Sequence, residues 1–78
     1  MASESLIGHV DVLRAFFRSM PVMDVDVRRR DGDLKVTVTL PEVAAESTVQ
    51  YVTSRTAGVL REYDRHAPRI DVAVRRAS

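Results

Sequence analysis

The stretch from Met23 to Leu40, MDVDVRRRDGDLKVTVTL, decides the fold of this chain. Apolar and polar residues alternate in both halves of the stretch, which is the pattern of strands with one buried face. Between the halves, Asp31-Gly32 accepts the positive backbone angles of a two-residue hairpin turn. Because a slip of one residue would set valine against threonine or aspartate, the register is well specified. It pairs Val27 with Val36, Val25 with Val38, and Met23 with Leu40, all on one face.

A helix is predicted ahead of this hairpin. Its apolar residues are spaced four, three, four and three apart, which places them on one helical face. They are Leu6, Val10, Leu13, Phe17 and Met20. Ser3 or Ser5 is expected to cap the start of the helix, because a short side-chain oxygen accepts a hydrogen bond from a free amide. Pro21 is expected to end it.

A second helix is predicted between Pro41 and Pro68, with two possible starts. Pro41 suits a first helical position, whereas Ser47 forms a capping box with Gln50. A start at Ser47 gives roughly 28 Å, close to the length of the hairpin, and is favoured over the longer helix. The helix carries an apolar stripe and a predicted bend near Ala57, where serine, threonine and glycine cluster. The stripe is Val49, Val52, Thr56, Val59 and Tyr63, with Leu60 beside it.

A third strand is predicted where Ile70, Val72 and Val74 alternate with other residues. The chain of 78 residues is therefore expected to form one domain, 1–78, of the α+β class. The expected architecture is a two-layer sandwich in the order helix–strand–strand–helix–strand, with both helices on one face of a three-stranded sheet. The expected open face is polar. It carries Asp24, Asp26, Arg28, Lys35, Thr37, Thr39, Asp71, Ala73 and Arg75.

The composition narrows the class of protein. The chain has no cysteine, so disulfides, thiolate catalysis and thiolate metal sites are excluded. No apolar run is as long as a membrane span and no signal peptide is recognisable, so a cytoplasmic location and no membrane partner are expected. The net charge is +1, and Lys35 is the only lysine among twelve basic residues. Arginine suits phosphate and carboxylate contacts, although a GC-rich genome also supplies it.

No arrangement of residues indicates catalysis. His66 lies one helical turn after Glu62, but no serine or cysteine is placed for it to activate, so a surface histidine is the favoured interpretation. Asp24 and Asp26 share a strand face and are interpreted as solvated rather than as a cation site. Arg28-Arg29-Arg30 is interpreted as a solubilising hairpin tip, with Arg29 pointing toward the helices. We therefore expect no enzyme activity, no cofactor and no metal.

Residues of the hairpin and of the second helix resemble the ribosome-binding factor A family, which has a KH-like fold. The hairpin from Val22 to Leu40, the segment Ala57-Gly58-Val59-Leu60-Arg61 and the proline before the last strand carry the resemblance. In that family an alanine–glycine kink breaks the second helix. The resemblance implies binding of structured RNA or the ribosome along this helix. The residues nearest the contact would be Arg55, Ala57, Gly58, Arg61 and Arg65.

Two other families share the order of elements. The run from Leu40 to Ala44 is similar to the proline-started helix of the alkaline-shock family, but the helix here is about two turns too long. The iron–sulfur scaffold domain needs cysteines that this chain lacks.

Two functions are thus open, RNA binding and protein interaction. Protein interaction, most simply in a homodimer, is indicated by the small core, by a possible free sheet edge and by surplus apolar residues at Ile7, Phe16 and Tyr51. Against RNA recognition by base stacking, the open sheet face carries no aromatic residue.

Overall fold

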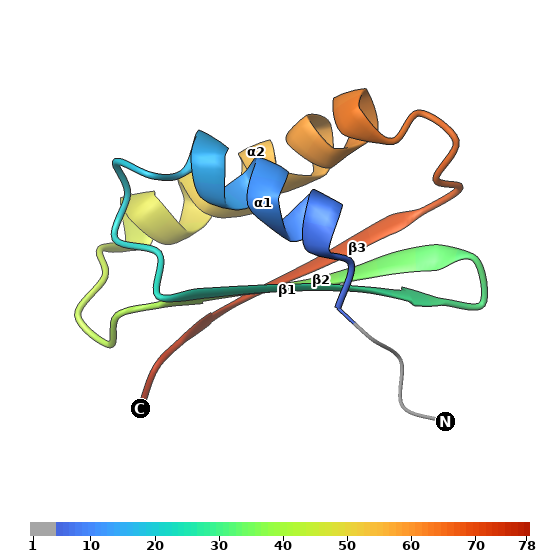
Figure 1. Ribbon diagram of the computed structural model, residues 1–78. Coiled ribbons are helices and arrows are strands. Elements are labelled where there is room, and N and C mark those ends of the chain that lie inside the picture. Colours follow the sequence, from blue (N-terminus) through green and yellow to red (C-terminus); the bar gives the residue numbers. More distant parts are fainter. Residues whose placement is uncertain (1–4) are drawn as a thin grey trace.

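The computed structural model describes residues 5–78 and has the predicted order of elements, with two helices and a three-stranded sheet. Figure 1 shows both helices above the same face of the sheet. The elements are α1 (Ile7–Phe16), β1 (Asp24–Arg30), β2 (Asp33–Leu40), α2 (Glu46–Tyr63) and β3 (Ile70–Arg76). The predicted α+β class is therefore confirmed.

The hairpin of β1 and β2 has the predicted register, with Val27 opposite Val36 and Val25 opposite Val38. Asp31 and Gly32 both have positive φ angles, 53° and 87°, as a two-residue turn requires. The third predicted pair is wrong. Met23 lies before β1, its N–H donates to the carbonyl of Thr39 instead of pairing with Leu40, and its side chain is 57% exposed.

The strand order is β1-β2-β3, with β2 in the centre and β3 parallel to it. A parallel neighbour needs a crossover, and α2 supplies it. The core lies between the sheet and the helices and is densest over β2. Its buried members are Leu13, Phe17, Val25, Val27, Leu34, Val36, Val38, Leu40, Val52, Leu60 and Ala67, with Thr56 as the one buried polar residue among those described.

Helix α1 differs from its prediction at both ends. Its N-cap is Leu6 and no side chain caps it, so the predicted cap at Ser5 is wrong, while Ser3 lies outside the described residues. The helix ends at Phe16, well before Pro21, and a turn follows in which Met20 donates its N–H to the Phe17 carbonyl. The turn sends the chain back to β1 while Phe17 stays in the core.

Helix α2 begins at Glu46, next to the favoured start, but the predicted capping box is wrong. The N-cap is Ala45, whose carbonyl accepts from the amides of Thr48 and Val49. Ser47 is therefore already inside the helix. The helix continues through Ala57 and Gly58, and the expected stripe is buried only at Val52, Thr56 and Leu60. Tyr63, predicted on the stripe, is 50% exposed.

Candidate functional site

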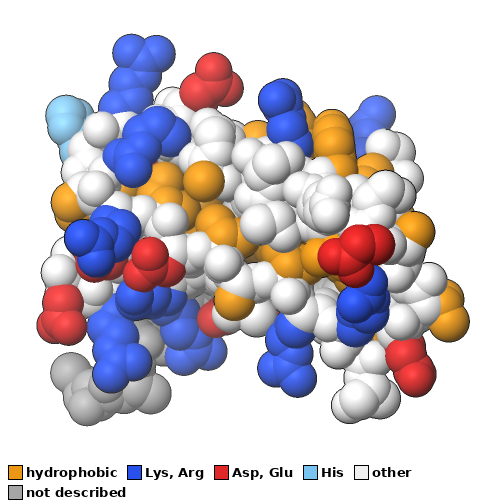
Figure 2. Space-filling model, turned by 180° about the vertical axis from the view of Figure 1, so that it is seen from behind, with side chains coloured by type: hydrophobic (Ala, Val, Ile, Leu, Met, Phe, Trp, Pro, Cys, Tyr) orange, Lys and Arg blue, Asp and Glu red, His pale blue; other side chains and the backbone are white. Residues whose placement is uncertain are grey.

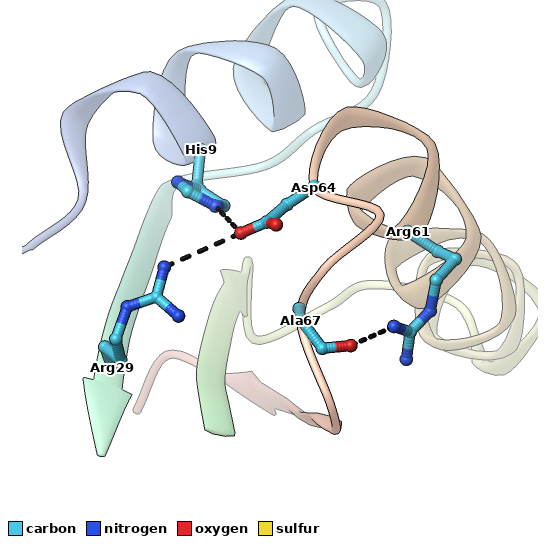
Figure 3. Close-up of polar contacts among 5 residues, drawn as sticks. All are labelled: His9, Arg29, Arg61, Asp64 and Ala67. Atoms are coloured by element: carbon cyan, nitrogen blue, oxygen red, sulfur yellow. Dashed lines mark hydrogen bonds and ion pairs between the residues drawn. The ribbon is translucent and has the colours of Figure 1, made fainter. Parts of the chain in front are cut away.

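The five residues that the resemblance assigned to RNA binding do not form one surface. Arg55 and Arg61 are six positions apart on α2, which separates them by about 120° around the helix axis. Arg55 lies 5.7 Å from the ring centre of Phe16, on the side of α1. Arg61 donates to the Ala67 carbonyl on the opposite flank (Figure 3). Arg65 follows the end of the helix, so no continuous arginine stripe runs along it.

Arg55 and Gly58 do share a shallow groove between α1 and α2. The groove has a volume of about 250 Å³ and is lined by Phe16, Ser54, Arg55, Gly58, Val59 and Glu62. Gly58 is exposed, and a β-carbon added to it would meet nothing within 4 Å. Because the groove holds one cation and one carboxylate, its charge is balanced. Ala57, by contrast, is half-buried on the flank toward β3.

A second cluster, which the sequence reasoning missed, joins α1, β1 and the end of α2 (Figure 3). The ring nitrogen Nε2 of His9 lies 3.0 Å from Oδ2 of Asp64, and Nη2 of Arg29 lies 3.6 Å from the same oxygen. Tyr63 packs against the His9 ring edge to face, at 5.0 Å between centroids. The predicted inward direction of Arg29 at the sheet's edge fits this contact.

Asp64 is the centre of this cluster. The hydrogen bond from His9 lowers its pKa below the ordinary 3.8, and the His66 backbone N–H and the charge of Arg29 act in the same direction against partial burial. The side chains of His9 and Asp64 are 14% and 18% exposed. The cluster thus ties three elements together at one end of the molecule. His66 itself is exposed, in keeping with the surface interpretation.

Three ion pairs involve charged residues of the open face of the sheet. Arg28 bonds Asp26 at 2.8 Å, Arg14 lies 3.4 Å from Asp24, and Lys35 bonds Asp71. Each strand carboxylate that the sequence offered as a cation ligand therefore faces an arginine. Within residues 5–78, no three histidines or carboxylates are grouped to hold a metal ion.

The two edges of the sheet differ. On the β1 side, the Leu6 N–H donates to the Val27 carbonyl at 2.7 Å, so the segment before α1 occupies part of that edge. The β3 side has no such cover among the described residues. There Ile70, Val72 and Val74 are only half-buried. Figure 2, which views the molecule from behind, shows hydrophobic side chains in a band across this side, surrounded by charged groups.

The backbone of β3 alternates in direction. Leu34 N–H donates to the Arg69 carbonyl and Ala77 N–H donates to the Leu40 carbonyl, so odd-numbered residues of β3 bond to β2. The even-numbered residues, Ile70, Val72, Val74 and Arg76, therefore direct their N–H and C=O groups away from the sheet. The β3 edge consists of these outward backbone groups together with the half-buried side chains of Ile70, Val72 and Val74.

Comparison of the chain with models of protein families, with curated proteins and with solved structures gives no match. Neither described helix has the length and apolar character needed to cross a membrane. The resemblance to ribosome-binding factor A remains a prediction from the sequence.

Proposed function

We propose that this domain is a non-enzymatic protein-interaction module, and that it binds an extended protein segment along the β3 edge. One observation carries the proposal: among the described residues, the outward backbone groups of β3 are unpaired and lie next to half-buried valines, while the opposite edge is partly covered by the chain itself. An edge strand of this kind is a template for another strand. The module would therefore act by strand addition.

The chemistry of the β3 edge suits an apolar extended segment. The outward N–H and C=O groups of Val72 and Val74 would supply main-chain hydrogen bonds, which give affinity without reading sequence. The half-exposed side chains of the same residues face the helix layer and would favour β-branched or aromatic neighbours across the new strand pair. On the open face Asp71 and Arg75 would select the charge of the partner.

Selection from a library of random extended peptides tests this proposal. Selected peptides should protect the amide protons of Val72 and Val74 from exchange and leave those of Asp71 and Ala73 unchanged, since the latter already bond to β2. This alternation of protected and unchanged amides along β3 is specific to strand addition at this edge. If the library yields no binder that protects the even-numbered amides of the monomeric protein, the β3 edge is not a binding site.

RNA binding along α2 is the second candidate function, and the groove beside Gly58 favours it. The Arg55 guanidinium stands over Phe16 at the mouth of this groove, in reach of a phosphate or a base. Binding should then weaken steeply with added salt. A filter-binding titration at low salt should show loss for Arg55→Ala and less loss for Arg61→Ala, because Arg61 is held by the Ala67 carbonyl. No affinity for structured RNA at low salt would remove this candidate.

A further inference from the structure

The β3 edge is complementary to itself, and we propose that its partner is the β3 edge of a second copy of this chain. This inference rests on the proposed function and names its partner. The two strands would run antiparallel about a twofold axis at Ala73, with Ala73 of one copy beside Ala73 of the other. The two three-stranded sheets would then form one continuous sheet of six strands.

The backbone directions permit this register. In an antiparallel ladder, residues whose N–H and C=O groups both point at the partner must lie opposite each other. A twofold axis at Ala73 sets Val72 opposite the partner's Val74, and Ile70 opposite the partner's Arg76, all of them even-numbered residues with outward groups. The odd-numbered residues fall into the alternate, closer pairs. Any register that opposed odd with even residues would break the ladder.

The charges select this register among those the backbone permits. With the axis at Ala73, Asp71 of each copy lies opposite the partner's Arg75 on the open face, where side chains of such pairs are closest. An axis at Val72 would instead oppose Arg69 and Arg75, and an axis at Asp71 would oppose two carboxylates. An axis at Val74 would oppose Ala73 and Arg75 and would form no charge pair.

Arg75 is available for the ion pair with the partner's Asp71. No ion pair involving Arg75 is formed within residues 5–78, and its neighbour across the ladder on β2 is Thr39. Asp71 already bonds Lys35 on β2, and a carboxylate has two oxygens, so it can accept from Lys35 and from the partner's Arg75 together. On the helix side, pairing of Val72 with the partner's Val74 would bury these half-buried side chains further.

The helices would meet across the axis, and α2 has a flank suited to this. Glu46, which pairs with Arg76 of β3, and Arg61, which bonds the Ala67 carbonyl, mark the flank of α2 on the β3 side. Between them the same flank carries Thr53 and Ala57, both small. Small residues let two helices approach to about 8 Å, the close end of the usual range. Sheet twist at the new strand pair opens the angle between them further.

Charge at the axis tests the self-pairing. Ala73→Lys places two like charges side by side in the pair and leaves the monomer intact, since Ala73 is exposed. Its matched control is Thr37→Lys, which adds the same charge on the same face one strand further in, directly beside Ala73 on β2. Light scattering should give a dimer for the wild type and for Thr37→Lys, and a monomer for Ala73→Lys. A wild type that stays monomeric at millimolar concentration overturns the self-pairing.

A mixing experiment tests the register. Arg75→Asp alone and Asp71→Arg alone should each dimerise roughly tenfold more weakly or worse, because both cross-axis pairs become like charges. An equimolar mixture of the two variants should dimerise again, since both pairs are then opposite in sign. Circular dichroism of each variant checks that it is folded. If the mixture is no tighter than the separate variants while the wild type dimerises, the register is wrong.

The outcomes separate this inference from the proposed function. A strict monomer whose Val72 and Val74 amides are still protected by selected peptides contradicts self-pairing and leaves the binding edge in place. A monomer that also binds no peptide there contradicts both.

Discussion

Val36 and Val72 form a matched pair for measuring how burial changes across the sheet. They lie opposite each other on β2 and β3 and both face the helices. Val36 is 2% exposed, whereas Val72 at the edge is half-buried. Truncation of either residue to alanine removes the same two methyl groups. A difference in cost therefore reports burial rather than residue type.

The magnitudes follow from the positions. Two methyl groups removed from a fully buried site cost about 1.6 kcal/mol of transfer free energy, and the cavity left behind raises the loss for Val36→Ala to about 2–3 kcal/mol. Val72→Ala should cost about 1 kcal/mol or less, because water already reaches that side chain. A domain of this size has roughly 4–12 kcal/mol of stability in total. The melting temperature should therefore fall by roughly 10–20 °C for Val36→Ala and about 5 °C for Val72→Ala.

Urea unfolding followed by circular dichroism measures both variants, at a protein concentration low enough to keep the chain monomeric. The slopes with denaturant should match that of the wild type, so that the shifts report stability alone. At higher concentration the wild type should gain apparent stability, since a partner that binds only the folded state shifts the equilibrium. Equal costs for the two variants in the dilute protein would refute the reasoning, because the β3 edge would then be as closed as the centre of the sheet.

Three further changes test other parts of the structure. Folding lowers the pKa of Asp64 from 3.8, so the contribution of Asp64 to stability is complete above that value and is lost as the pH falls through the folded pKa. In Asp64→Asn the urea midpoint should therefore fall less steeply between neutral and acid pH than in the wild type. The exposed Asp11→Asn is the control. Gly32→Ala should destabilise by about 1 kcal/mol or more, since φ is 87° there, as read from thermal melts. Gly58→Ala should stabilise the protein by about 0.5–1 kcal/mol, because alanine loses less backbone freedom than glycine on folding into a helix and the added β-carbon meets nothing within 4 Å. A loss of stability would contradict the helical geometry at this position.

The parts of the fold that depend on neighbouring residues in the sequence were predicted correctly, whereas the ends of the elements were not. The hairpin register followed from two-residue alternation around Asp31-Gly32, and both of its central valine pairs are confirmed. The misplaced features lie at element ends. Met23 was assigned to the buried face by alternation alone, yet the strand begins one residue later, at Asp24. The predicted caps failed because the N-cap positions fall on Leu6 and Ala45, whose side chains have no oxygen to accept a hydrogen bond.

The candidate site was less predictable because it depends on contacts between distant segments. His9 and Asp64 are 55 positions apart, and nothing in either neighbourhood marks them as partners. The division of Arg55 from Arg61 follows from helical spacing alone, since six positions separate two residues by about 120° around a helix axis. The outward direction of the β3 backbone, by contrast, required the strand order, which the sequence left open.

The hydrogen bond from Leu6 to Val27 has a consequence for assembly as well as for the fold. A sheet with two open sides can add molecules without end and grow into fibres. Here the Leu6 N–H already occupies the Val27 carbonyl, so the β1 side is partly covered and growth through the β3 side stops as soon as two molecules have met. Loss of the Leu6 contact would free that carbonyl as well, and the expected product is then a filament rather than a discrete pair.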